Sequence, residues 1–182
     1  LVKRLVAGYK ARGTKVLISS CPCCVNIMAR DWPVIYGKEL PFKIRHITQH
    51  VVDAMKERKL KFKKGLKERL IYHDPCYLSR GVGVIEEPRE VLRSIPGVEL
   101  LEFDNNRLNS KCCGAGGAAR KVFLDNAYGM ARKTIDEAVE KGADKLVLSC
   151  PACYNTVNAS KEGHDKQIPI LDIMEVFADV IE

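Results

Sequence analysis

The sequence predicts an α/β fold with a mostly parallel sheet flanked by helices, because short apolar strands alternate with helical segments. Strands are expected at 16–18, 70–72 and 146–148, where continuous apolar runs indicate burial on both faces, and another at 98–103. Three of these strands run directly or closely into loops that carry cysteines. Because sites in parallel sheets gather at the carboxyl ends of strands, a site is expected at that edge.

The helices are expected between the strands. Apolar residues recur at helical spacing over 1–9, 46–55, 127–141 and 171–181, and Gly13 and Gly142 follow the first and third of these segments. A helix is expected over 25–29, with an extension to Trp32 as the alternative, and Pro33 opposes its continuation. Another begins at Pro88 and is broken by Pro96-Gly97.

Composition is that of a soluble globular protein, with 46% apolar and 29% charged residues. No run approaches the length of a membrane span, and no signal peptide is visible. The first residue is Leu1 inside a helical pattern, which predicts that the chain is a piece of something longer.

Most of the net charge of +7 lies in residues 56–69, which hold eight Lys or Arg and two Glu. This single run contains one aromatic residue, Phe62, whereas nucleic-acid readers spread charge along a face with interleaved aromatics. We therefore expect no nucleic-acid partner and interpret the run as a solvated linker. A docking patch for an acidic partner or an anionic surface is the alternative.

Eight cysteines stand out, and their spacing is not that of a secreted disulfide framework. Five are expected to converge from three loops, with 35 residues before the adjacent pair and 36 after it: Cys76, Cys112, Cys113, Cys150 and Cys153. Structural zinc needs four tetrahedral ligands, for which adjacent residues are awkward. A core of several irons accepts neighbouring thiolates, and the glycines after the pair let the backbone approach it. An iron–sulfur site, a zinc site and a dithiol redox site all remain open.

An internal repeat is visible when residues 1–55 are laid over 130–182. Seven identities share one offset of 129, among them Cys21, Pro22 and Cys24 against Cys150, Pro151 and Cys153. The repeat predicts two related domains, 1–60 and 61–182, the first lacking its amino-terminal half. Cys23 aligns with Ala152 and is therefore interpreted as a local extra rather than a ligand.

The spacing, together with "YHDPCYLSRGVGVIEEPREVLRSIPGVEL" and "CCGAGG", resembles the cysteine-rich CCG domain of heterodisulfide reductases and related iron–sulfur oxidoreductases. The likeness is to the catalytic subunits of the D and B types, and the full motif covers residues 70–182. It implies two pseudo-repeated CCG domains, the first truncated at its amino terminus. It also implies that each complete motif holds a non-cubane four-iron, four-sulfur cluster through five cysteines.

Transferred by position, the resemblance implies one cluster on Cys76, Cys112, Cys113, Cys150 and Cys153. Cys21 and Cys24 would be the last two ligands of a second, incomplete site. His73 is a weak candidate for a proton donor, and a role in fixing its loop is the alternative. Arg80, Arg107 and Lys111 are candidates for balancing thiolate charge or receiving an anionic disulfide. Tyr77 and Tyr154 are expected to pack beside the ligands.

The function that the resemblance implies is reduction of a heterodisulfide of the CoM-S-S-CoB type. The alternative is an electron-transfer subunit of a quinone-linked oxidoreductase acting on glycolate, lactate or succinate. A zinc-stabilised interaction module is the non-catalytic alternative. The expected partners are a disulfide substrate and electron-donating redox subunits. The expected location is the cytoplasm, with peripheral attachment to the membrane through a partner as a further expectation.

Overall fold

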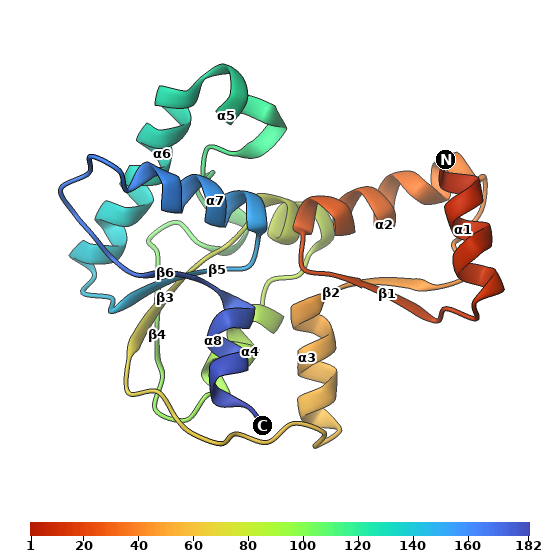
Figure 1. The fold of residues 1–182 in the computed structure, drawn as a ribbon, viewed down its shortest axis with the longest axis horizontal. Helices are drawn as coiled ribbons and strands as arrows, with labels where there is room; N and C mark the ends of the chain where they lie inside the picture. Colours follow the sequence, from red (N-terminus) through yellow and green to blue (C-terminus); the bar gives the residue numbers. More distant parts are fainter.

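A computed structural model describes residues 1–182 and shows two parallel sheets in an α/β arrangement. The larger sheet has the strand order β4-β3-β5-β6 and consists of Glu99–Glu102, Arg69–His73, Lys145–Leu148 and Ile170–Asp172. The smaller sheet pairs β1 (Val16–Ser19) with β2 (Lys43–His46). In Figure 1 the smaller sheet lies beside the larger body as an arm, with α1 (Val2–Ala11) and α2 (Pro22–Tyr36). The predicted α/β class with parallel sheets is confirmed.

Helices cover both faces of the four-stranded sheet, and alternate residues of each strand face opposite layers. Ile71, Leu146 and Leu148 pack with α6 (Leu124–Glu140) and α7 (Pro151–Ser160) on one face. On the other face, Leu70, Tyr72 and Val147 pack with α4 (Glu87–Arg93), α8 (Ile173–Val180) and α3 (Ile47–Lys56). The central strands β3 and β5 are thus buried on both sides, as their apolar runs predict. The same prediction is wrong for residues 16–18, because Val16 and Ile18 are exposed where only one other strand pairs with β1.

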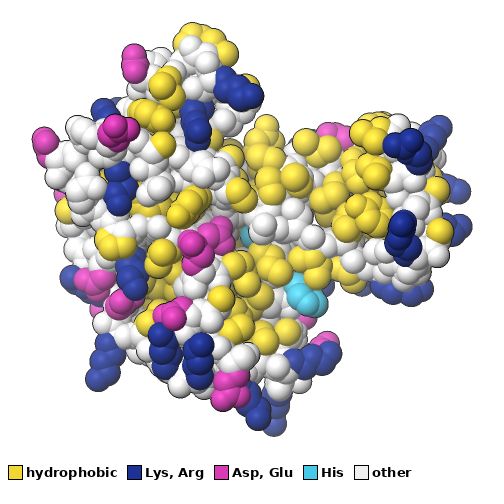
Figure 2. All heavy atoms as spheres, viewed as in Figure 1, with side chains coloured by type: hydrophobic (Ala, Val, Ile, Leu, Met, Phe, Trp, Pro, Cys, Tyr) yellow, Lys and Arg dark blue, Asp and Glu magenta, His cyan; other side chains and the backbone are white.

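The arm is more open than the body. Val16 and Ile18 of β1 and Ile27, Val34 and Ile35 of α2 are exposed apolar side chains. Figure 2 shows hydrophobic side chains gathered over this part of the molecule. No helix of the chain has the length and apolar character needed to cross a bilayer.

The strand–helix order β1-α2-β2-α3 recurs as β5-α7-β6-α8. His46 and Asp172 stand opposite the last residues of β1 and β5, and each caps the following helix through a capping box. However, Val51 and Val52 of α3 share one apolar cluster with α4 and α8. The division at residue 60 and the pseudo-repeat therefore stay predictions.

Two details of the expected secondary structure are wrong. The helix over 25–29 extends as α2 from Pro22 to Tyr36, through Pro33, and ends at Gly37 with a positive φ of 84°. A proline removes one backbone hydrogen bond, and the residues after it can remain helical. The strands β2 and β6 were not expected, because these short, partly polar segments produce no apolar run.

The backbone of the basic run is anchored near its middle, while most of its charged side chains are exposed. Phe62 forms an antiparallel bridge with Ile181, and the N–H of Lys63 donates to the carbonyl of Val180 at 2.8 Å. Lys64 pairs with Asp179 at 2.8 Å. The segment between α3 and β3 is thus anchored along the end of α8.

A buried ion cluster joins α4, β4 and the loop after β3. The guanidinium of Arg89, fully buried, donates two hydrogen bonds of 2.7 Å to Asp74 and bonds of 2.7 and 2.8 Å to Glu102. It also lies 5.2 Å from the ring centre of Tyr72. Burial opposes the charge, yet the hydrogen bonds to Asp74 and Glu102 outweigh it and raise the pKa of Arg89.

Replacing Arg89 by Met is expected to lower the free energy of unfolding by about 3–5 kcal/mol, because Asp74 is left as a buried, unpaired charge. Arg93→Met is the matched control, since Arg93 is 53% exposed and pairs with Glu86 at 3.6 Å and with the exposed side of the cluster at Glu102 at 3.9 Å. Its cost should stay below about 1 kcal/mol. Urea unfolding of the cluster-free protein, followed by circular dichroism, measures both. If the free energy of unfolding of Arg89→Met lies within about 1 kcal/mol of the wild-type value, the range expected for the control, the buried ion cluster does not stabilise the fold as proposed.

Candidate metal centre at the carboxyl ends of the strands

Four loops that carry cysteines leave the carboxyl ends of parallel strands. Cys76 follows β3, Cys112 and Cys113 follow β4 after a short 3₁₀ turn (η2, Arg107–Asn109), and Cys150 follows β5 directly. Cys21 follows β1 in the arm. The parallel arrangement therefore brings the loops to one edge of each sheet, as predicted.

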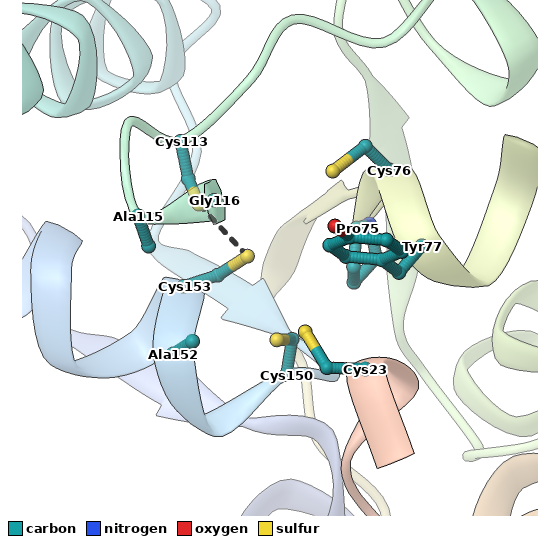
Figure 3. A pocket seen from close by; sticks show the side chains of 10 residues that line it. All are labelled: Cys23, Pro75, Cys76, Tyr77, Cys113, Ala115, Gly116, Cys150, Ala152 and Cys153. Carbon is teal, nitrogen blue, oxygen red and sulfur yellow. Dashed lines mark hydrogen bonds between the residues drawn. The ribbon is translucent and has the colours of Figure 1, made fainter. Parts of the chain in front are cut away.

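One pocket is lined by four of the five predicted ligands: Cys76, Cys113, Cys150 and Cys153. Figure 3 shows their sulfur atoms directed toward a common space, with Cys76 on the side opposite Cys150 and Cys153. The lining is almost entirely apolar apart from the thiols and includes Ala115 and Ala152. The cavity measures about 20 Å³, so the thiols lie close together.

The adjacent cysteines Cys112 and Cys113 point to different partners. The sulfurs of Cys113 and Cys153 form a hydrogen-bonded contact of 2.9 Å. Cys112 instead accepts hydrogen bonds from Cys113 and Cys76 and from backbone N–H groups of the glycine-rich turn, which lowers its pKa. The thiol of Cys76 donates its proton to the sulfur of Cys112 in this hydrogen bond, which raises the pKa of Cys76. The pair thus bridges two parts of the site.

The amino terminus of α7 stabilises a second thiolate. Hydrogen bonds from the Cys153 thiol and from the N–H groups of Cys153 and Ala152 lower the pKa of Cys150 to about 7, against its burial. Pro151 starts the helix at the position where a missing N–H costs nothing. Since thiols bind metals as thiolates, Cys112 and Cys150 are prepared for that role.

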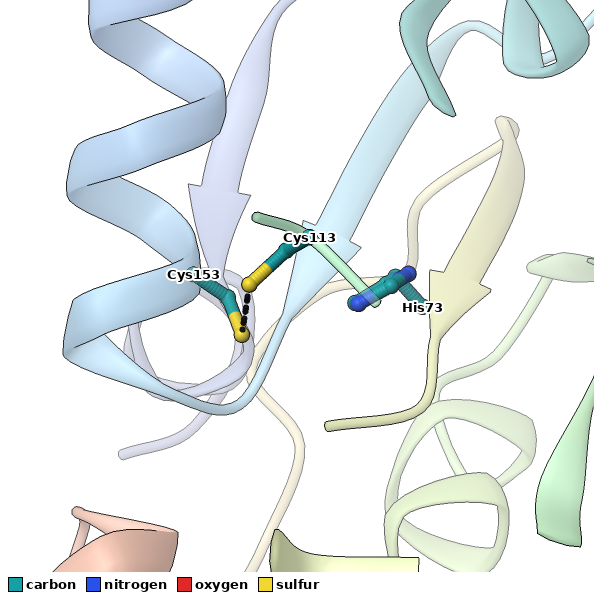
Figure 4. Close-up of side chains that lie close together, drawn as sticks. All are labelled: His73, Cys113 and Cys153. Atoms are coloured by element: carbon teal, nitrogen blue, oxygen red, sulfur yellow. Dashed lines mark hydrogen bonds between the residues drawn. The ribbon is translucent and has the colours of Figure 1, made fainter. Parts of the chain in front are cut away.

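His73 lies at the end of β3 against the same thiols. Its ring nitrogen and the sulfurs of Cys113 and Cys153 all lie within 4.8 Å of one another (Figure 4). The imidazole stacks edge-on against Phe103 with ring centres 6.1 Å apart. Burial lowers the pKa of His73 to about 4. The neutral imidazole is thus a poor source of protons at neutral pH.

The arm brings three further cysteines to the site. Cys21 shares side-chain hydrogen bonds with Cys23 and Cys24, and the charge of Cys150 acts on both of the latter. Cys23 lines the cysteine pocket beside Cys150 (Figure 3). Burial, with that charge, raises the pKa of Cys23 to about 11. The internal repeat did not indicate Cys23 as a site residue, because its counterpart is alanine. Its position in the first turn of a helix that follows a cysteine-bearing strand end could have indicated it.

Residues 70–158 match the family model of the cysteine-rich domain named CCG. The chain carries a CCG domain. Over its whole length it is 36% identical to the D subunit of the dihydromethanophenazine:CoB–CoM heterodisulfide reductase of Methanosarcina barkeri, covering 44% of that protein. It is 31% identical to the B subunit of a fumarate reductase (CoM/CoB) of Methanothermobacter marburgensis, covering 96% of this chain and 34% of that one.

The "Probable iron-sulfur-binding oxidoreductase FadF" of Bacillus subtilis is 27% identical over the whole chain, which covers 26% of it. The chain spans less than half the length of each of these relatives. The recognition of the CCG domain from its cysteine spacing is confirmed.

The donor set of the CCG domain suits a core of several metals better than one zinc ion. The ligand atoms within 4.8 Å of one another belong to His73, Cys113 and Cys153, so the predicted ligands Cys76, Cys112 and Cys150 lie outside this group. The sulfurs around Cys112 and those around Cys113 can each bind a different metal ion of one core. Since the cavity is about 20 Å³, loading such a core requires the cysteine side chains to separate.

Hydrogen bonds between buried polar groups hold the ligand loops together. The Nε2–H of His46 donates to the carbonyl of Ser20 at 3.3 Å, while Nδ1 accepts from Thr48 at the start of α3. The backbone of Ser149 also hydrogen-bonds to His46, and its hydroxyl lies 2.7 Å from that of Tyr72. His46 thus contacts the residues just before Cys21 and Cys150.

The loop that carries Cys112 is fixed by two charged residues. Asp74 accepts from the N–H of Arg107 at 2.7 Å, and Arg80 donates to the carbonyls of Leu108 and Ser110 at 3.0 and 2.8 Å. The side chain of Arg107 pairs with Glu86 at 2.7 Å.

Of the other residues that the sequence analysis names, Tyr77 lines the pocket, whereas Lys111 and Tyr154 do not. Lys111 pairs with Glu137 at 3.0 Å, and Tyr154 packs beside the core under the site.

The glycine of the CCG motif is required by packing against α6. Gly114 has a φ of 86°, and a Cβ there would lie 2.4 Å from the carbonyl oxygen of Ala127. Its N–H donates to the sulfur of Cys112 at 3.3 Å. Gly114 thus lets the backbone approach α6, and the approach of the glycines to an iron core stays a prediction.

Gly114→Ala is expected to lower the free energy of unfolding by about 2 kcal/mol or more, because both the left-handed backbone and the contact with Ala127 are strained. Gly116→Ala is the control: a Cβ at Gly116 meets no atom within 4 Å. It should change stability by no more than about 0.5 kcal/mol. Chemical unfolding of the cluster-free proteins measures the difference, and equal stabilities of the two variants contradict the packing explanation.

Acid is expected to destabilise the fold through His46. Burial lowers the pKa of His46 from 6.5 to about 4, so the unfolded chain binds the proton more readily. The stabilisation that the neutral, buried His46 contributes is complete above the pKa of 6.5 that it has in the unfolded chain. It is lost as the pH falls toward about 4, the pKa of His46 in the folded chain. Between pH 7 and about pH 4.5 the wild type should lose about 2 kcal/mol more than His46→Asn, which keeps a capping side chain without the titration. Urea unfolding at both pH values tests this, and parallel losses disprove it.

Proposed function

We propose that this chain is part of an iron–sulfur oxidoreductase that reduces a small disulfide beside its cysteine pocket. The observation that carries the proposal is the convergence of four of the five predicted ligand thiols in an apolar pocket, with Cys112 beside it. Cys112 and Cys150 are stabilised as thiolates. The relationship to a heterodisulfide reductase subunit over the full chain supports the reaction class. A CoM-S-S-CoB-type heterodisulfide is the substrate we propose.

Non-cubane four-iron, four-sulfur clusters are the proposed cofactor. Cys76, Cys112, Cys113, Cys150 and Cys153 are its proposed ligands at the complete site. Cys21 and Cys24 are the proposed ligands of a second site, completed by residues outside this chain. Such a cofactor supplies electrons one at a time.

The residues of the chain would bind and shield the reacting sulfurs. In the net reaction, a disulfide takes up two electrons and two protons and yields two thiols, with the electrons coming from a redox partner subunit. The apolar lining excludes water from the reacting sulfurs. Tyr77 and Cys76 form the rim where the pocket meets a second, polar groove. His73 is neutral and buried, which favours a role in holding the loop over one in proton transfer.

A relay function is the second candidate. The likeness to the B subunit of a fumarate reductase supports it, because that relative is named for a reaction in which fumarate is reduced. In that case the pocket would pass electrons without binding a disulfide. In both cases we propose partner subunits that donate or accept electrons and a cytoplasmic location, attached to the membrane face through such a partner.

Iron and acid-labile sulfide in the anaerobically loaded protein are expected in equal amounts, at about four each per complete site. Cys112→Ser and Cys150→Ser should lose most of both, because each removes a stabilised thiolate. Cys23→Ala is the control, since alanine already stands at the equivalent Ala152, and it should retain them. One zinc per chain without labile sulfide overturns the proposed cofactor.

Electron paramagnetic resonance separates reductase from relay. Adding the heterodisulfide to the loaded, oxidised protein should change the spectrum if the substrate binds at the pocket. An unchanged spectrum, with electron transfer to a quinone-linked partner intact, favours the relay.

A further inference from the structure

A polar groove adjoins the cysteine pocket. It has a volume of about 310 Å³ and is lined by Arg30, Cys76, Tyr77, Arg80 and Gly81. Cys76 and Tyr77 line both the groove and the cysteine pocket. A molecule with one end in the groove can therefore place another group beside the thiols.

The charge of the groove is positive and uncompensated. Two of its five lining residues are arginines, and none is acidic. Arg80 donates to the carbonyls of Leu108 and Ser110 through Nη1 alone, so its Nη2 and Nε donors remain free. Neither Arg30 nor Arg80 is among the residues that form ion pairs with carboxylates in the chain.

Backbone packing of the arm against the first ligand loop brings the two arginines to one groove. Arg30 comes from α2 of the arm, one turn after Asn26, whose side chain lies against Gly81 so closely that a Cβ there would be 2.6 Å from Oδ1. Arg80 comes from the π-helical turn η1 (Tyr77–Gly81) that starts at Cys76. Such turns are rare and are frequent at functional sites. The groove is therefore built where the arm meets the first ligand loop.

We propose that Arg30 and Arg80 form an anion-binding subsite that receives a carboxylate, sulfonate or phosphate group of a small thiol or disulfide. The guanidinium groups donate charge-assisted hydrogen bonds to the anionic group, while the sulfur end reaches the thiols past Tyr77. This inference rests on the proposed function for the role of the sulfur. The preference for an anion rests on the groove alone.

The test compares two disulfides of similar size, dithiodipropionate, which is anionic, and bis(hydroxyethyl) disulfide, which is neutral. Calorimetry on the cluster-loaded, oxidised protein measures their binding without turnover. The wild type should bind the anionic disulfide at least about tenfold more tightly, as one charge-assisted contact implies. Arg30→Gln should abolish the difference, whereas Arg30→Lys should retain part of it.

Arg12→Gln is the matched control, because Arg12 is an exposed arginine just after the first helix and lies outside the groove. It removes the same charge and should leave the preference unchanged. Arg30 is the primary target rather than Arg80, since Arg80 also anchors the loop that carries Cys112. Equal binding of the two disulfides by the wild type, or an equal loss in Arg12→Gln and Arg30→Gln, overturns the proposal.

Reduction assays with a chemical electron donor such as titanium(III) citrate separate this inference from the proposed function. Reduction of neither disulfide, together with the tenfold binding preference, contradicts disulfide reduction and supports the anion subsite. Reduction of both at equal rates and with equal affinities supports the reductase and contradicts the subsite.

Discussion

The buried charge of Arg89 is the constraint on which the arrangement of the cysteine site depends. A fully buried guanidinium is stable only if its donors are satisfied, and here Asp74 and Glu102 accept four of its hydrogen bonds. Asp74 stands two residues before Cys76, and it also accepts from the backbone of Arg107 on the way to Cys112. One ion cluster thereby sets the relative positions of two ligand loops.

The same principle extends across the sheet to the arm. Tyr72 lies under the Arg89 guanidinium and hydrogen-bonds to Ser149, while His46 links Ser149 to Ser20. Since these groups are buried, losing a partner costs free energy, which favours a fixed arrangement of the loops before Cys21 and Cys150. The polar contacts beneath the site hold the loops in place, and the thiols above them need only face the pocket.

Within that frame, the adjacent cysteines divide the site. Cys112 interacts with Cys76, and Cys113 with Cys153, so the pair joins sulfurs from different loops. The tight turn that makes this possible depends on Gly114, which α6 approaches too closely for any side chain. The contact between Gly81 and Asn26 likewise lets the arm pack against the first ligand loop. Both glycines act through packing against another segment, and the cysteine motif by itself does not reveal those contacts.

The sequence by itself determined the strands of the body and the meeting of the ligand loops, because continuous apolar runs specify buried parallel strands whose carboxyl ends share an edge. It did not reveal β2 or β6, whose short, partly polar segments pair only because a neighbouring strand offers hydrogen bonds. Only the tertiary structure placed Cys23 in the pocket, buried Arg89 and brought Arg30 beside Arg80. These placements depend on contacts between residues far apart in the chain, and no local pattern of residues encodes such contacts.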